Sequence, residues 1–290
     1  MFNARVAALS LIFLLLVLPT SAQNQGERLR TTVVVPSLTP GAPPRLDYVL
    51  DVTDNASTFQ LDASKNVLKG KTQTKVRLLA DYDVELIVDS SLSMRKADCP
   101  SGLSRWNWCG IQAKDLGDKL SPYVPRGLTI TAFNGSYNVY RNATPSNIAD
   151  LFNNPNFRGG TRLAEPLANR LNEFFTRRKS GSKPLLIAVI TDGVPHPQEQ
   201  PIMVASTLVN ASKHMKDACE VTVVFFQIGS RAKFGRTFLD YLDNELVSNG
   251  ARHDFVKTVS FDHLVQVGLS NALVESIEQF ARIRAEAPLK

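Results

Sequence analysis

Two apolar runs in this chain, residues 84–88 and 185–190, each lead into an aspartate, Asp89 and Asp192. Apart from Glu85, the runs consist of apolar and partly β-branched residues, which is typical of strands covered on both faces in a parallel sheet. Ligands of an open parallel sheet gather beyond the carboxyl ends of its strands. The pattern therefore predicts an α/β fold with both aspartates at one edge of the sheet.

Hydroxyl groups accompany these aspartates. The segment after the first strand reads D-x-S-x-S, with Asp89, Ser91 and Ser93, and a Gly159-Gly160 turn presents Thr161 just before a helical pattern. Carboxylate and hydroxyl oxygens suit a small hard cation such as Mg²⁺. Taken alone, the first segment is more typical of a helix cap and turn. The two downstream pieces favour a cation site.

The order and spacing of these pieces resemble the von Willebrand factor type A (VWA) domain family over residues 82–280. Its metal-ion-dependent adhesion site combines D-x-S-x-S, a Thr in a Gly-Gly-Thr-like loop and an Asp in a T-D-G turn, matched here at Asp89, Ser91, Ser93, Thr161 and Asp192. The resemblance implies that the first four bind Mg²⁺, or else Mn²⁺ or Ca²⁺, and that Asp192 acts through a water. It also implies an open coordination position for an Asp or Glu of a protein partner.

Strand-like and helix-like patterns alternate from residue 81 onward. This predicts a doubly wound, Rossmann-like α/β fold with a mostly parallel six-stranded sheet and helices on both faces. The expected strands are residues 84–88, 128–133, 137–140, 185–191, 221–228 and 253–256, the third pairing antiparallel with the second. The expected helices are residues 109–120, 146–152, 162–176, 199–216, 234–247 and 262–280.

The ends of the chain suggest export and an appended arm. Residues 1–22 combine Arg5, an apolar run and small residues before a cleavage point, which predicts a signal peptide and a secreted, extracellular or periplasmic protein without a membrane span after cleavage. Residues 23–80 read as an extended arm or linker, with short strands expected near 32–35, 48–52 and 74–79. The VWA-like domain is expected at 81–282, with a tail at 283–290.

The three cysteines fit an oxidising compartment. Cys99 and Cys109 flank a short insert, and we expect them to form a disulfide that fixes the insert beside the metal site. Cys219 would then be a buried free thiol, although pairing of Cys219 with one of the others is the alternative. The cysteines are not expected to bind metal, because no histidine lies at ligand spacing.

Basic and aromatic residues fall in the loops expected around the metal. They predict a partner-binding rim that captures an acidic segment, with Trp106 and Trp108 as anchors. Its members are Trp106, Trp108, Arg158, Gly160 and Arg231, with Arg95, Lys96, Arg105, Arg162 and Lys233 nearby. The alternative is that the charges are solvated and the tryptophans pack the insert. The formal net charge of +6 is spread along the chain, without the clustered arms of nucleic-acid modules.

These observations favour a non-enzymatic binding module over two alternatives. In a metal-dependent hydrolase a general base would stand beside the cation, and the sequence places none there; it also has no phosphate-binding G-x-x-x-x-G-K-[ST] loop. In a scaffold the metal would be purely structural. The sequence therefore predicts metal-dependent adhesion or protein binding through an acidic residue of a protein partner.

Overall fold

The computed structural model of this protein describes residues 30–33, 46–49, 73–229 and 233–286. Its main sheet has six strands in the order β5-β4-β3-β6-β7-β8. Neighbouring strands are parallel, except that β5 runs antiparallel to β4. The strands are β3 (Asp83–Asp89), β4 (Leu128–Phe133), β5 (Tyr137–Ala143), β6 (Leu185–Thr191), β7 (Val221–Gln227) and β8 (Val256–Val259). The predicted doubly wound, mostly parallel six-stranded sheet is confirmed.

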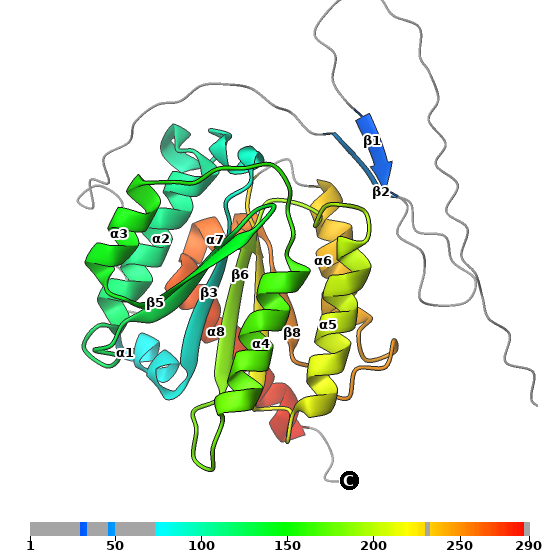
Figure 1. The fold of residues 1–290 in the computed structure, drawn as a ribbon. Coiled ribbons are helices and arrows are strands. Elements are labelled where there is room, and N and C mark those ends of the chain that lie inside the picture. The colour runs from blue at the N-terminus through cyan, green and yellow to red at the C-terminus, as the bar shows by residue number, and fades with distance from the viewer. Residues whose placement is uncertain (1–29, 34–45, 50–72, 230–232, 287–290) are drawn as a thin grey trace, which may run out of the picture.

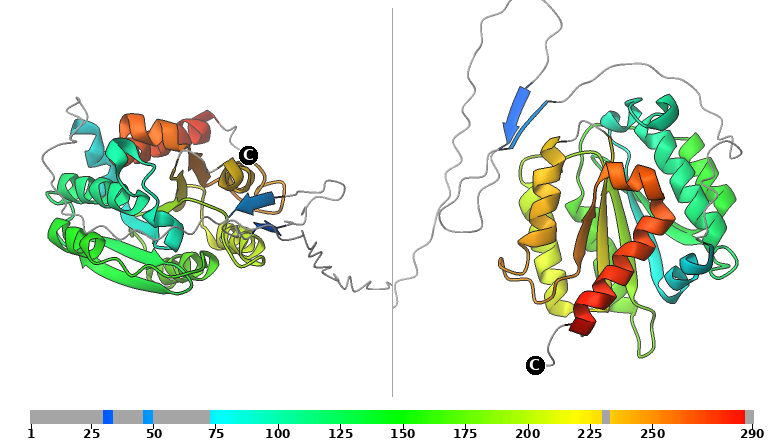
Figure 2. Two further views of the ribbon diagram at one scale, coloured as in Figure 1. Left: turned by 90° about the horizontal axis from the view of Figure 1, so that it is seen from above. Right: turned by 180° about the vertical axis from the view of Figure 1, so that it is seen from behind.

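Helices cover both faces of this sheet (Figures 1 and 2). The helices are α1 (Gln73–Val76), α2 (Arg105–Leu120), α3 (Pro145–Asn153), α4 (Ala164–Arg177), α5 (Gln200–His214), α6 (Lys233–Asn244), α7 (Phe261–Val267) and α8 (Leu269–Glu286), with short 3₁₀ turns at Arg77–Asp81, Leu92–Arg95 and Pro100–Gly102.

Alternation along the buried strands produces two hydrophobic layers, because successive side chains point to opposite faces. In β6, Leu186, Ala188 and Ile190 pack with α2, α7 and α8. Leu185, Ile187 and Val189 pack on the other side with α4, α5 and α6. The strands are therefore rigid supports whose carboxyl ends carry the loops described below.

Several element boundaries differ from the sequence predictions. Helix α2 begins at residue 105 rather than 109, because the Ser104 side chain caps it by accepting from the Asn107 N–H. The predicted helix 262–280 is broken at Gly268, whose φ of 77° ends α7 before α8 begins. The last strand lies three residues later than expected, at Val256–Val259.

The boundary of the predicted arm also moves. Residues 74–79 form helical turns rather than the expected strand, and Val76 and Leu79 are buried in the main core. The globular unit therefore begins inside the predicted 23–80 arm, and α8 continues into the predicted 283–290 tail.

Farther upstream, β1 (Arg30–Val33) and β2 (Leu46–Val49) pair antiparallel as a separate two-stranded sheet. The predicted signal peptide at residues 1–22 lies outside the described residues. Among the helices that the structure describes, none has the length and apolar character needed to cross a membrane.

Candidate functional site

The two aspartates meet at one edge of the sheet. Asp89 is the last residue of β3 and Asp192 directly follows β6, and these strands are parallel neighbours. Their carboxyl ends lie at the top of the view in Figure 1. Asp89 is fully buried and Asp192 is 8% exposed. The predicted meeting of both carboxylates is thus a feature of the fold.

Hydrogen bonds join the aspartates and the two motif serines into what we call the oxygen cluster: Asp89, Ser91, Ser93 and Asp192. The Ser91 N–H donates to Asp89 Oδ1 at 2.8 Å, and the hydroxyls of Ser91 and Ser93 lie 2.9 Å apart. The Ser93 hydroxyl then donates to Asp192 Oδ1 at 3.0 Å. Thr191 donates to the other oxygen of Asp89 at 2.8 Å, so that both Asp89 oxygens are held in place.

The Gly159-Gly160-Thr161 loop lies beside this cluster. Arg158, at its start, forms a parallel bridge with Ser91, and the Thr161 backbone forms an antiparallel bridge with His196. Gly160 has a φ of 92°, and a Cβ there would lie 3.0 Å from the Gly135 Cα. Glycine is therefore required for the close approach that brings Thr161 to this edge. Thr161 as a metal ligand remains a prediction.

Asn134 and Thr191 are site-building residues that sequence reasoning missed. The Asn134 side chain donates to the Ser90 hydroxyl at 3.1 Å and to the Asn156 carbonyl at 2.9 Å. It thereby ties the strand end to the segment that leads into the glycine loop. The T in T-D-G was a usable signal for Thr191. For Asn134 the sequence offered none, because its partners lie 22 and 44 residues away.

Burial and mutual repulsion make the two carboxyls of the cluster electrostatically unequal to exposed ones. Burial and the neighbouring Asp192 charge raise the pKa of Asp89 to about 7, although hydrogen bonds from Ser91 and Thr191 oppose the rise. Two carboxylates crowded in a partly buried site repel each other and attract positive charge. No group of three or more His, Cys, Asp or Glu in the described part of the chain is placed to hold a metal. The oxygen cluster has two carboxylates and two hydroxyls, donors that fit a hard cation rather than a soft one.

Arg105 is a buried partner of the cluster, not a rim residue as its loop position suggested. Its side chain is 7% exposed. Its Nη1 lies 2.5 Å from Asp192 Oδ2, while Nε and Nη2 donate to the two oxygens of Asp98 at 2.8 and 2.6 Å. The sequence could not indicate this pairing, because Asp192 is 87 residues away.

The two tryptophans lie in the core rather than on the partner-binding rim. Trp106 and Trp108 are 1% and 6% exposed. Trp106 packs on Phe152 and donates its indole N–H to the Phe152 carbonyl, and Trp108 packs edge-on against Phe261. Because both rings are covered in this structure, the expected role as exposed anchors is wrong for it. The alternative was that they pack the insert, whereas the ring contacts observed are to Phe152 in α3 and Phe261 in α7.

The remaining rim residues are divided. Arg158 and Arg162 are exposed beside the glycine loop, and Gly160, Arg95 and Lys96 are partly exposed. Arg231 lies outside the described residues, as does the side chain of Lys233. Arg162 pairs with Glu165 at 3.2 Å, so its charge is partly neutralised by a neighbour.

All three cysteines are free thiols in this structure. Cys99 and Cys109 are buried in the same core cluster. The pKa of the Cys109 thiol is raised, mainly by burial and to a lesser extent by the charge of the nearby Cys99. The predicted disulfide between them is not formed here and remains a prediction for the exported protein. Cys219 is exposed, so its expected burial is wrong.

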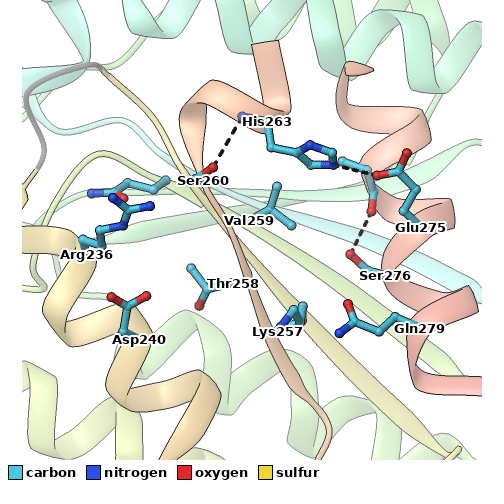
Figure 3. Close-up of a pocket in the computed structure, with 12 residues that line it drawn as sticks. Arg236, Asp240, Lys257, Thr258, Val259, Ser260, His263, Glu275, Ser276 and Gln279 are labelled. Carbon is cyan, nitrogen blue, oxygen red and sulfur yellow. Dashed lines mark hydrogen bonds and ion pairs between the residues drawn. The ribbon is translucent and has the colours of Figure 1, made fainter. Parts of the chain in front are cut away.

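A separate cavity of about 360 Å³ lies between α6, β8, α7 and α8 (Figure 3). It is lined by both acidic and basic side chains, among them Arg236, Asp240 and Lys257. Two further lining residues, His263 and Glu275, are joined by a hydrogen bond of 2.6 Å between Nε2 and Oε2. None of the predicted site residues that the structure describes lines this cavity.

Comparisons with known proteins add a set of distant likenesses. No protein-family model matches the chain, and no curated protein sequence does. A solved structure of the manganese-loaded TRAP protein of Plasmodium vivax is similar at 16% identity over 64% of this chain and 70% of that one, with a TM-score of 0.44. Proximal thread matrix protein 1 from the mussel byssus is similar at 19% identity over 67% and 45%, with a TM-score of 0.42. The RO (RSR) protein of Deinococcus radiodurans is similar at 14% identity over 68% and 35%, with a TM-score of 0.39. The matched region is thus less than half of the second and third proteins, and the chemistry of the site rests on the contacts above.

Proposed function

We propose that this chain is a binding module that holds a divalent cation at the oxygen cluster and uses it to bind an acidic residue of a protein partner. Asp89, Ser91, Ser93 and Thr161 would bind the cation, with Asp192 in its outer shell. The cation would be Mg²⁺, with Mn²⁺ and Ca²⁺ as alternatives. When bound, it would supply a positive charge that an Asp or Glu carboxylate can complete.

The observation that carries this proposal is the hydrogen-bonded string from Asp89 through Ser91 and Ser93 to Asp192. It gathers two carboxylates and two neutral hydroxyls beyond the ends of two neighbouring strands. A cation held mainly by hydroxyls keeps much of its charge, which favours recognition of an external carboxylate. Exposed Arg158 would add attraction for an acidic segment. A secreted location is part of this proposal and rests on the signal-like residues 1–22.

An array of peptides that each contain one Asp or Glu, beside matched peptides with Asn or Gln, tests the proposal. The full chain should bind a subset of acidic peptides in Mg²⁺, and binding should disappear with chelator or with the amide peptide. Binding that ignores both changes would contradict a cation-mediated contact. Cation binding without capture of any acidic peptide would instead indicate a structural metal.

A further inference from the structure

Arg105 is held between two carboxylates in a way that a surface arginine is not. Its guanidinium forms a two-pronged pair with Asp98, and its remaining nitrogen Nη1 contacts Asp192 Oδ2. The side chains of Arg105, Asp98 and Asp192 are 7%, 16% and 5% exposed. Ion pairs in such sheltered positions are weakly screened by solvent.

The surrounding backbone leaves room for this guanidinium and holds the Arg105 main chain in place. Gly229, just beyond β7, has a φ of 94°, and a Cβ there would lie 2.5 Å from Arg105 Nε. Any larger residue at that position would therefore displace the guanidinium. At the other end, the Arg105 N–H donates to the Lys96 carbonyl at 2.9 Å. Arg105 is thus placed by three separate segments of the chain.

The consequence for Asp192 is that both of its oxygens already have partners. Oδ1 accepts from Ser93, and Oδ2 faces the fixed positive charge of Arg105. Burial opposes the charged form of Arg105, but the hydrogen bond to Asp98 and the Asp192 charge outweigh it and raise its pKa. One guanidinium therefore serves two carboxylates, and only part of its charge is available to Asp192.

We propose that Arg105 is a resident counter-ion of Asp192 that weakens divalent-cation binding at the oxygen cluster and stabilises the fold when no cation is bound. Asp98 acts in the opposite direction, because it draws the guanidinium charge away from Asp192. Like charges close together repel, so the positive charge of Arg105 repels a divalent cation that binds beside Asp192. This inference rests on the proposed cation site and names the residues that set its affinity.

Mn²⁺ titration of the metal-stripped full chain by calorimetry tests this inference. Arg105→Met should bind Mn²⁺ about tenfold or more tightly than the wild type, because one positive charge near the site is gone. Its metal-free melting temperature should fall, because Asp98 and Asp192 lose their counter-ion. Asp98→Asn should weaken Mn²⁺ binding several-fold. Arg126→Met and Asp118→Asn, which make the same chemical changes at exposed positions, should leave affinity unchanged.

Arg105→Lys separates charge from geometry, and it is also the milder variant if Arg105→Met fails to fold. Lysine keeps the charge without the two-pronged fork, so its Mn²⁺ affinity should stay near that of the wild type. The inference is overturned if Arg105→Met binds Mn²⁺ no more tightly than the wild type, or if Arg105→Lys matches a tighter-binding Arg105→Met. Mn²⁺ binding by Arg105→Met but not by the wild type would support the counter-ion and contradict the proposed function. Binding by neither protein would overturn both.

Discussion

Gly160 occupies a backbone position that other residues would strain, and its neighbour Gly159 provides a matched control. Gly160→Ala should lower the free energy of unfolding by about 1–3 kcal/mol, because its φ is 92° and the new Cβ would meet the Gly135 backbone. Nothing lies within 4 Å of a Cβ at Gly159, so Gly159→Ala should change it by less than about 0.5 kcal/mol. Urea unfolding of both variants measures this, and equal effects would show that the loop does not need the close approach.

Arg170 and Glu85 form a buried ion pair. Breaking this pair should lower the stability of the fold by an amount that depends on pH. Arg170 is fully buried, and its Nε lies 3.0 Å from Glu85 Oε2. Burial raises the pKa of Glu85 to about 7, while Arg170 opposes the rise. Because the native state holds this proton more tightly than the unfolded chain, the contribution of Glu85 to stability is fully present below about pH 4.5 and is lost as pH rises through 7.

Arg170→Met removes the closest cation from that carboxyl. At about pH 8 Glu85 tends to ionise, and in this variant its charge would have lost its nearest positive partner. The free energy of unfolding should therefore fall by about 3–5 kcal/mol. At about pH 5 the loss should be smaller, because Glu85 can stay protonated. The double variant Glu85→Gln with Arg170→Met should recover most of the stability at pH 8, because no buried charge is left unpaired. A loss that is the same at both pH values would contradict the assigned cause.

Individual roles were predictable where a local motif carries them and not where a distant residue does. Asp89, Ser91, Ser93 and Asp192 come together as their strand-end positions predicted. Arg105 was expected at the rim because loop position was the only available signal, and its contact with Asp192 spans 87 residues. The prediction that the tryptophans are exposed anchors was wrong for a related reason. The rings are covered by Phe152 and Phe261, which lie in other elements and far away in the sequence.

At the scale of elements, the start of α2 connects the motif loop to the core. Ser104 caps this helix, and the next residue is the counter-ion Arg105. Ser104→Ala should lower the free energy of unfolding by about 1 kcal/mol, the usual effect of losing a cap. Ser180→Ala, at an exposed turn, is the control and should have little effect. If thermal unfolding shows no difference between the two variants, the Ser104 cap contributes nothing measurable.

Element types were predictable from periodicity, and their ends were less so. Apolar runs and helical stripes gave the main strands and helices, because buried strands and amphipathic helices differ in repeat. Gly268 shows why α7 and α8 were predicted as one continuous helix. A glycine inside a helical pattern is tolerated in many helices, and only the observed φ of 77° shows that this one breaks it.

At the scale of the whole molecule, helices connect the parallel strands of one sheet, as alternating strand and helix patterns predict. The chain thereby brings β3 and β6 side by side, although about 100 residues separate their aspartates. Both faces of the sheet are covered, so the carboxyl edge is where loops can gather functional groups. The prediction that the two aspartates meet is confirmed because it depended only on this edge of the sheet. The prediction of the rim depended on side-chain directions, which strand order does not determine.

Calorimetric titration of Mn²⁺ into the metal-stripped full chain is the most direct test of the central claim, that the oxygen cluster is a cation site. The wild type should show one saturable site, and Asp118→Asn, an exposed carboxylate control on α2, should match it. Asp89→Asn keeps the shape of the buried side chain but removes its charge, and should weaken binding by about a hundredfold or more. Undiminished binding in Asp89→Asn, or no binding by the wild type, would contradict the account.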